Sequence, residues 1–381
     1  MVSQRNCCCP SVMVICLRIS ILGTRGIPAS YGGFETCVEE ISTRLAARGH
    51  DVRVYCRSAY PNGQSRSYKG VRLVQMPMLK KSFVASPFNS LIANVHASLS
   101  DAEVIHFFGC GNIPFTLPAR LSGKKVVLTL DGLEWKRMSY SQVARMYLRS
   151  FEELAMVFPH ATVADSVSSQ DWYFQRTGIM PRYIPYGITR STEVNDDILK
   201  KYDLERENYV LFSGRLVYEK GAHTLIEAFR SVKGDVKLAI VGDYPGGSEY
   251  TKMLKQNADS RTVFLGFVYG KEFETARNGA LIYVHPSLLD GTSISLLGAL
   301  GSGRCVLSSD LKENRDVAGE SAEYFAIGDP EDLKSKLQHL LDNRATIAEA
   351  GGRAMARAKA LFDWDMVTDA YEETYTSLAD R

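Results

Sequence analysis

The residues best suited to chemistry gather in one short stretch of the chain. A buried strand predicted to end near His285 is followed by Asp290, Gly291 and Thr292, and a helix is predicted to begin at Ser293. Small residues before a helix leave backbone N–H groups exposed at the positive end of the helix dipole, where a phosphate binds readily. The Asp290 carboxylate is suited to accept hydrogen bonds from sugar hydroxyls. The stretch therefore predicts a phosphate site with a hydroxyl acceptor beside it.

A second loop suited to anions follows the strand predicted over 209–212. It contains Gly214, Arg215 and Lys220, and Gly221 ends it. Arg215 and Lys220 are spaced to converge on one anion if the loop folds back on itself. The leaving group of a nucleotide sugar is a diphosphate, and its developing charge needs fixed cations or a metal ion. The spacing favours a diphosphate site, with two solvated side chains as the alternative.

A third loop joins the strand predicted over 18–22 to the Gly32-Gly33 pair at the start of a helix. It lacks the G-x-G-x-x-G spacing of a dinucleotide fingerprint, and the next strand ends in Cys56-Arg57 rather than in an acidic residue. A nicotinamide cofactor is therefore disfavoured. The two glycines instead allow the backbone to approach a phosphate, or they form a structural turn.

A fourth loop follows the strand predicted over 125–129 and contains Asp131, Glu134 and Trp135. The two carboxylates suit hydrogen bonds to a sugar or to an acceptor hydroxyl, and the indole suits stacking on a sugar ring. A turn capped by Asp131 is the alternative interpretation.

Strands rich in β-branched residues alternate with helical patterns through most of the chain, which predicts parallel sheets covered on both faces. A polar linker over 189–208 divides two such series, and the clearest helices are predicted over 34–48 and 364–378. Two doubly wound domains place a ligand cleft between them, at the carboxyl ends of both sheets. We predict strands over 18–22, 52–55, 71–75, 104–107, 125–129 and 161–164 in the first domain, and over 209–212, 236–241, 263–265, 281–284 and 305–308 in the second.

Length and composition agree with this division. A chain of 381 residues suggests two domains of about 150–200 residues each, and 45% apolar with 23% charged residues is typical of a soluble globular protein. The overall charge of +2 conceals a stretch, 61–150, with twelve Lys and Arg against four Asp and Glu. This stretch is either solvated surface or a basic face for anionic lipid or a lipid-phosphate acceptor. Nucleic acid is disfavoured, because no known nucleic-acid-binding module accompanies the charge.

The eight cysteines include no C-x-x-C pair, which argues against a zinc ribbon or a redox motif. Isolated cysteines in apolar strands suit free thiols in a reducing cytoplasm. The apolar run Val12–Leu17 is too short to span a membrane. The histidines, His106 and His285 among them, show no ligand spacing, and we expect structural roles for them.

Two longer patterns carry a family resemblance. Residues 286–303 read P-S-x-x-D-G-x-S-x-S-L-L-x-A-L-x-x-G, which resembles the signature of retaining glycosyltransferases of family GT4 with the GT-B fold. Residues 23–36 read GTRGIPxxYGGFET, which resembles a GT4 subgroup that includes bacterial rhamnosyltransferases of polysaccharide assembly. The D-G-L-E-W run at 131–135 is similar to the same subgroup. Weaker similarity extends over nearly the whole chain.

The resemblance implies an α/β protein of the GT-B fold, with two doubly wound Rossmann-like domains facing a central cleft. It implies a tail at 1–12, an acceptor-side domain at 13–188, a linker at 189–207, a nucleotide-sugar-binding domain at 208–360 and a final helix at 361–381 that crosses back to the first domain. It assigns catalysis to Asp290, Arg215, Lys220 and Asp131, donor binding to Gly32, Gly33, Gly214, Arg215, Lys220, Asp290, Gly291, Thr292 and Ser293, and the acceptor side to Arg25, Tyr31, Glu134 and Trp135.

The function implied is that of a retaining hexosyltransferase in cell-surface polysaccharide synthesis. Its donor would be a nucleotide-diphosphate sugar, with deoxythymidine diphosphate rhamnose suggested by the subgroup, and its acceptor a saccharide or a lipid-linked saccharide. No cofactor and no metal are implied. Asp363-Trp364-Asp365 matches the D-x-D pattern of metal-dependent transferases, but it stands at a predicted helix start, where Asp363 suits an N-cap. We expect a cytoplasmic protein, peripheral on the inner face of the membrane.

One position departs from the family pattern. An acidic pair spaced by eight residues is usual, in which the second member holds the ribose of the nucleotide, and that second position is Gly298 here. Glycine offers no side-chain acceptor, so donor binding is expected to weaken by about 1.5–3 kcal/mol. The alternative to an active enzyme is therefore a non-catalytic GT-B protein that binds a nucleotide sugar or assists an active transferase.

Overall fold

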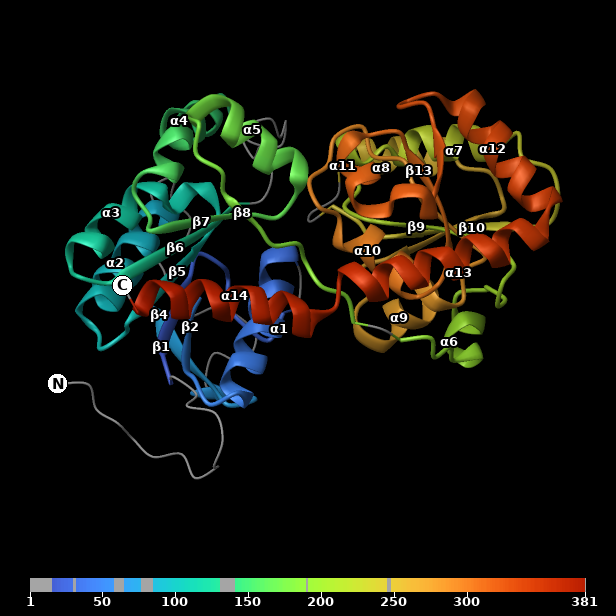
Figure 1. Cartoon of the computed structure of the whole chain (residues 1–381). Coiled ribbons are helices and arrows are strands. Elements are labelled where there is room, and N and C mark those ends of the chain that lie inside the picture. Colours follow the sequence, from blue (N-terminus) through green and yellow to red (C-terminus); the bar gives the residue numbers. More distant parts are fainter. Residues whose placement is uncertain are drawn as a thin grey trace.

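The computed structural model describes residues 16–29, 32–57, 65–76, 85–130, 141–189, 191–244 and 248–380, with the backbone alone over 85–88. The predicted tail at 1–12 lies outside these residues. The described chain forms two α/β domains, each around its own sheet, which are the two lobes of Figure 1. This is the expected two-domain, doubly wound architecture.

The sheet of the first domain has the described strand order β3-β4-β2-β1-β5-β6-β7-β8. All neighbouring strands are parallel except β3 and β4. That pair is a hairpin whose turn residues, Lys69 and Gly70, both have positive φ, as tight hairpin turns require. The helices and strands of the first domain are β1 Arg18–Leu22, α1 Gly33–Ala47, β2 Asp51–Arg57, β3 Ser67–Tyr68, β4 Val71–Met76, α2 Ala85–Leu99, β5 Val104–Phe108, α3 Ile113–Leu121, β6 Lys125–Leu130, α4 Gln142–Phe151, β7 Ala161–Ala164, α5 Val167–Thr177 and β8 Arg182–Tyr183.

The sheet of the second domain is parallel throughout its described strands, in the order β11-β10-β9-β12-β13-β14. Because β9 and β12 are neighbours, the loops that follow them leave the sheet side by side at its carboxyl edge. The elements are α6 Asp196–Lys201, β9 Tyr209–Ser213, α7 Ala222–Phe229, β10 Lys237–Val241, α8 Glu249–Asn257, β11 Thr262–Gly266, α9 Gly270–Asn278, β12 Ile282–His285, α10 Ile294–Gly301, β13 Cys305–Ser309, α11 Lys312–Ala318, β14 Glu323–Phe325, α12 Pro330–Asp342, α13 Arg344–Leu361 and α14 Trp364–Ala379.

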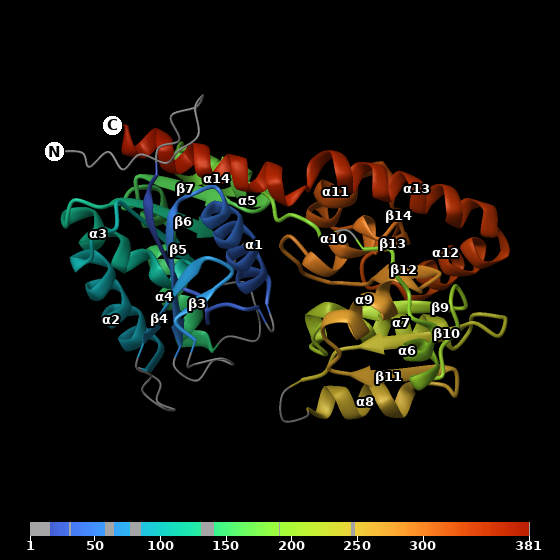
Figure 2. The same ribbon diagram turned by 90° about the horizontal axis from the view of Figure 1, so that it is seen from below.

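Helices cover both faces of each sheet, as the near-continuous apolar strands require. In the first domain α1 and α14 cover one face, and α2 and α3 cover the other (Figure 2). In the second domain α7 and α12 pack on one face, and α10 and α13 on the other. The core beneath α1 and α14 continues into the core beneath α10, so one apolar cluster joins the two domains.

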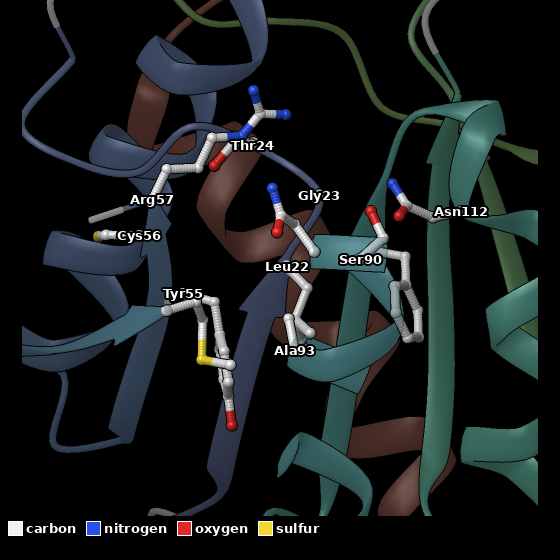
Figure 3. Close-up of a pocket in the computed structure, with 12 residues that line it drawn as sticks. Leu22, Gly23, Thr24, Tyr55, Cys56, Arg57, Ser90, Ala93 and Asn112 are labelled. Atoms are coloured by element: carbon white, nitrogen blue, oxygen red, sulfur yellow. The ribbon is translucent and has the colours of Figure 1, made fainter. Parts of the chain in front are cut away.

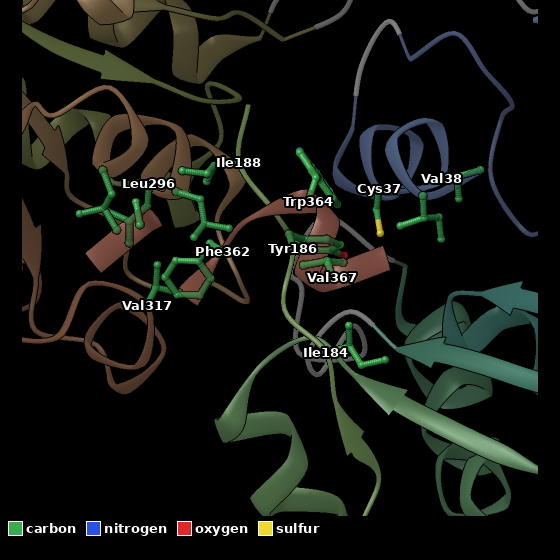
Figure 4. Close-up of a cluster of buried hydrophobic side chains, with 14 of the residues drawn as sticks. Cys37, Val38, Ile184, Tyr186, Ile188, Leu296, Val317, Phe362, Trp364 and Val367 are labelled. Carbon is green, nitrogen blue, oxygen red and sulfur yellow. The ribbon is translucent and has the colours of Figure 1, made fainter. Parts of the chain in front are cut away.

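Two chain segments cross between the domains side by side. The Ile188 amide donates to the Phe362 carbonyl at 2.7 Å, and Gly187 lies against the Trp364 ring, so closely that a Cβ there would come within 2.4 Å of it. Figure 4 shows Tyr186, Ile188, Phe362 and Trp364 in this apolar crossing. The crossing links the end of the first domain to the start of α14.

Helix α14 returns to the first domain and lies across it (Figure 1). Arg48, which follows the last residue of α1, pairs with Asp369 at 2.6 Å, and the buried His106 ring contacts the Tyr375 hydroxyl at 2.7 Å. The final helix is therefore part of the first domain's core. None of the described helices combines the length and the apolar composition needed to cross a membrane.

Candidate active site

Asp290 forms the centre of a buried polar cluster at the carboxyl edge of the second sheet. The Lys220 Nζ lies 2.7 Å from each carboxylate oxygen of Asp290. His285 Nε2 and Ser287 Oγ each lie 2.9 Å from Oδ2, and the Gly291 amide donates to Oδ1 at 3.1 Å. The exposed fraction of the Asp290 side chain is 9% and that of Lys220 is 19%. All acceptor positions of this carboxylate are engaged.

The charge of Asp290 is set by these partners. Burial alone would raise the pKa of its carboxyl group, but the Lys220 ammonium and the His285 hydrogen bond outweigh burial and hold the pKa well below its usual range. The carboxylate is therefore ionised, and it keeps the Lys220 ammonium at one place. An ammonium has three donors, so one of them remains for a second anion.

The two loops that carry Lys220 and Asp290 are held together by their backbones. The Leu288 amide donates to the Glu219 carbonyl at 2.8 Å. Gly221 has a φ of 67°, and a Cβ there would come within 1.9 Å of the Pro286 carbonyl oxygen, so only glycine fits. This close approach explains why a lysine and an aspartate that lie 70 residues apart in sequence meet.

His285 was expected to be structural, and the structure places it in the site. Its Nδ1 lies 3.4 Å from the buried Tyr283 hydroxyl, and that hydroxyl contacts the Ser213 carbonyl, also at 3.4 Å. A buried polar path thus leads from β9 to Asp290. The sequence did contain a signal for this role, because His285 is the last residue of the strand that precedes the Asp290 loop.

Two helix N-termini from different domains meet beside this cluster. Ser293 caps α10, with its Oγ accepting from the Leu296 amide at 3.4 Å. Gly33, the first residue of α1 after the N-cap Gly32, faces Ile294 so closely that a Cβ on Gly33 would lie 3.3 Å from Cδ1 of Ile294. Both dipoles therefore present their positive ends to the same region.

The domains also touch directly at this loop. The Thr292 hydroxyl, expected to bind a donor, donates to the Asp165 carbonyl at 2.8 Å. Ser168 of α5 contacts Asp316 of α11 at 2.7 Å on the same boundary. The Asp290 loop is thus at the interface between the two domains.

Arg215 follows Gly214 in the loop after β9, and it is partly buried. Within the described part of the chain, its guanidinium has no hydrogen bond or ion pair, whereas Lys220 is bound to Asp290. The two cations are on the same loop, but no contact joins them. On the first-domain side, the Arg25 amide donates to Glu35 Oε1 at 3.1 Å in the first turn of α1.

The space beside Gly298 is occupied by an arginine. A Cβ on Gly298 would come within 2.7 Å of Arg277 Nη1, and Arg277 Nε donates to Ser302 Oγ at 2.8 Å. Burial lowers the pKa of the Arg277 guanidinium. A cation therefore lies next to Gly298, the position at which the sequence departs from the resembled family pattern.

The other predicted residues, Tyr31, Asp131, Glu134 and Trp135, lie outside the described residues. Asp363 is the predicted N-cap, with its Oδ1 accepting from the Asp365 amide at 2.8 Å. Among the described residues, no group of three or more His, Cys, Asp or Glu side chains is arranged to hold a metal ion.

The two sheets, the crossing final helix and the loop cluster at the domain boundary define a GT-B fold. Two family models match the chain, "Glycosyltransferase Family 4" over residues 31–191 and "Glycosyl transferases group 1" over residues 207–343. The chain belongs to the GT4 glycosyltransferases with the GT-B fold, as the pattern at 286–303 indicated.

Known proteins agree with this assignment. The O-antigen chain mannosyltransferase C of Escherichia coli is 23% identical over 372 residues, covering 92% of this chain and 96% of that protein. The fold is similar to sucrose-phosphate synthase from Thermosynechococcus elongatus, with a TM-score of 0.79 at 19% identity over 95% of this chain and 99% of that one. It is also similar to Anabaena HepE in complex with UDP and glucose, with a TM-score of 0.78 and 19% identity. That match covers 95% of this chain and 100% of the HepE chain.

Proposed function

We propose that this chain is a retaining hexosyltransferase that moves a sugar from a nucleoside-diphosphate donor to a saccharide or lipid-linked saccharide in cell-surface polysaccharide synthesis. The O-antigen mannosyltransferase among its relatives supports the polysaccharide context, and the structure of HepE with UDP supports the donor class. We place the reaction in the cytoplasm, and no metal or other cofactor takes part.

The observation that carries this proposal is the Lys220–Asp290 pair beside the N-termini of α1 and α10. A departing diphosphate needs positive charge that is fixed before the reaction, so that no reorganisation is required during it. Asp290 fixes the ammonium, the third Lys220 donor and Arg215 bind the phosphates, and the two helix dipoles add to the field. Asp290 is thus first a positioning residue, and it contacts the sugar only by exchanging one of its present partners.

Transfer then proceeds on one face of the sugar. The bond from the anomeric carbon to the diphosphate oxygen breaks, and the acceptor hydroxyl approaches from the first-domain side. The new glycosidic bond forms on the same face, and the hydroxyl proton passes to the departing diphosphate. Closure of the domains around the site, through contacts such as Thr292 to Asp165, excludes water and limits hydrolysis of the donor.

Gly298 bears on the choice of nucleotide. A side chain that hydrogen-bonds a ribose hydroxyl discriminates strongly against a nucleotide that lacks it, because the side chain is then left unpaired. Glycine has no such group to leave unpaired. A 2′-deoxynucleotide is therefore tolerated, which supports deoxythymidine diphosphate rhamnose as the donor to test first.

The outer surface of the first domain supports a peripheral membrane location. Leu91, Val95 and Leu99 stand four residues apart on α2 and are 45%, 50% and 83% exposed, which makes one apolar stripe. α4 exposes Val143 and Met146 in a segment that also carries arginines. Apolar side chains together with basic ones are the composition that binds anionic membrane surfaces.

A screen of nucleotide sugars tests the proposal. Thermal shift first identifies the donors that bind, and release of the nucleoside diphosphate is then measured for each. We expect release from at least one donor, with retained anomeric configuration in the product. Binding without release from any donor, with acceptors of either class present, would instead support the non-catalytic alternative.

A further inference from the structure

A pocket in the first domain lies at the carboxyl ends of β1, β2, β4 and β5, beneath α2 (Figure 3). Since β1 stands between β2 and β5, this is the point at which the strand order reverses, where open α/β sheets bind ligands. The space between its walls, counted together with its open mouth, is about 510 Å³. The described residues that line it are Leu22, Gly23, Thr24, Tyr55, Cys56, Arg57, Met76, Asn89, Ser90, Ala93, Phe107 and Asn112.

The pocket has two chemically different ends. Arg57 and Thr24 lie together at one end, and Tyr55 and Ala93 lie at the other (Figure 3). Among the described residues, its lining includes hydroxyl and amide side chains and one arginine but no carboxylate. The composition suits a ligand with an anionic group at the Arg57 end and an apolar or sugar-like body at the other.

The Thr24 hydroxyl is a polar group without a partner in the described structure. The residue is 7% exposed, and its Oγ1 has no hydrogen-bond partner among the described residues. A buried hydroxyl left unpaired costs about 1–3 kcal/mol. Because Thr24 lines the pocket, a ligand there supplies the missing partner.

Positive charge is in excess at this end. Arg57 lies within electrostatic range of Arg25 and of Glu35, and burial followed by the Arg25 charge lowers the pKa of the Arg57 guanidinium. The two guanidinium groups repel each other, and Glu35 Oε1 already accepts from the Arg25 amide. An anion beside Arg57 would offset this repulsion.

The charged end is also the end nearest the candidate active site. Glu35 belongs to the first turn of α1, and the first helical residue of α1, Gly33, packs against Ile294 at the start of α10. The charged end of the pocket thus lies on the first-domain side of the boundary where the donor residues lie. An acceptor with its phosphate at Arg57 and its apolar part at the Tyr55 end would extend its sugar beyond the phosphate, toward the donor.

We propose that this pocket binds a phosphate or diphosphate group of the acceptor, with the Arg57 guanidinium as its cation and the Thr24 hydroxyl as its hydrogen-bond donor. This inference rests on the proposed transferase function and adds the chemical class of the acceptor. Two sources share that chemistry, a soluble sugar phosphate and a lipid-linked one. The apolar stripe of Leu91, Val95 and Leu99 on the outer side of α2 favours the lipid-linked source.

Calorimetric binding of three probes to the full chain, without any nucleotide sugar, tests the pocket separately from catalysis. The probes are glucose 1-phosphate, farnesyl diphosphate and methyl glucoside. We expect both phosphate-bearing probes to bind and methyl glucoside not to bind at millimolar concentration. Arg57→Gln should weaken phosphate binding roughly ten- to a hundred-fold, and Arg57→Lys should restore part of it.

Two controls locate the binding. Arg18→Gln removes an equal charge at the opposite end of β1, where Arg18 pairs with Glu103 on the surface, and should leave binding unchanged. Arg215→Gln tests whether the phosphate enters the donor site instead. Thr24→Val should weaken binding by a smaller factor than Arg57→Gln. Circular dichroism confirms that each variant is folded.

The inference is overturned if neither phosphate probe binds, if methyl glucoside binds equally well, or if Arg215→Gln abolishes binding that Arg57→Gln leaves intact. Tighter binding of farnesyl diphosphate than of glucose 1-phosphate identifies a lipid-linked acceptor, and the reverse order a soluble one; both results support the pocket. Because no donor is present, failure of the transferase reaction would not change these readings.

Discussion

The Nζ of Lys220 lies 2.7 Å from both carboxylate oxygens of Asp290, so the two residues form a bidentate ion pair. The pair connects the loop after β9 to the loop after β12, and neither side chain is more than 19% exposed. Such a pair places a cation at a defined position before any substrate arrives. Under the proposed function, that position is where the charge of the leaving diphosphate develops.

Removing the cation should destabilise the protein. Lys220→Met leaves the buried Asp290 carboxylate without its main partner, which costs about 3–5 kcal/mol in comparable buried pairs. Urea unfolding measures the loss. The double variant Lys220→Met/Asp290→Asn should recover part of it, because no uncompensated charge remains. A single variant as stable as the wild type would show that the pair contributes nothing to the fold.

The Asp290 pair should also appear in the pH dependence of stability. The pKa of Asp290 is lower in the folded protein than its ordinary value of about 3.9, so its contribution is complete above about pH 5 and is lost as the pH falls below about 4. The free energy of unfolding of the wild type should therefore fall more steeply in this acid range than that of Asp290→Asn. Parallel curves would contradict the ion pair.

His106 should act in a different pH window. Burial lowers the pKa of its imidazole to about 3, whereas an unfolded histidine titrates near about 6.5. Because only the unfolded state gains a proton between these values, stability falls by about 1.4 kcal/mol per pH unit as the pH drops through this window. His106→Gln should remove this slope. An unchanged slope between pH 6 and 4 would mean that His106 is not the buried group responsible.

Gly298→Glu tests whether α10 faces the nucleotide. The new side chain would displace the Arg277 guanidinium, whose Nη1 lies 2.7 Å from the Cβ position, and that guanidinium is the end of a flexible side chain. We expect binding of a ribonucleoside diphosphate, which has the 2′-hydroxyl, to tighten by roughly ten-fold, because the carboxylate gains a charge-assisted hydrogen bond to the ribose. Gly298→Ala is the control for the loss of glycine. Equal donor affinity in both variants would show that this position does not face the ribose.

The sequence predicted the architecture well because apolar periodicity is a local property. β1 and β7 have the predicted bounds, and α10 begins at Ile294, one residue after the predicted start at Ser293. The short edge strands β3, β8 and β14 were missed, since two or three residues show no period. Each of these strands forms because it pairs with a neighbouring strand of the sheet, and its own residues show no strand pattern.

The site was predictable only in part, because contacts between distant loops leave no local pattern. Asp290 and Lys220 were both singled out, but as separate contacts to a sugar and a phosphate rather than as one ion pair. His285 was missed, although it lies 2.9 Å from Asp290. The Arg277 side chain beside Gly298 comes from a different helix, and no spacing in the sequence indicates it.

The release of nucleoside diphosphate from a bound nucleotide sugar, compared between the wild type, Lys220→Met and Lys252→Met, tests the central claim most directly. Lys252 forms an exposed pair with Glu249 on α8, so its variant removes an equal charge away from the site. We predict that Lys220→Met slows release by about a hundred-fold or more while remaining folded, and that Lys252→Met releases at the wild-type rate. Equal rates in all three proteins would contradict the role of the Lys220–Asp290 pair in donor activation.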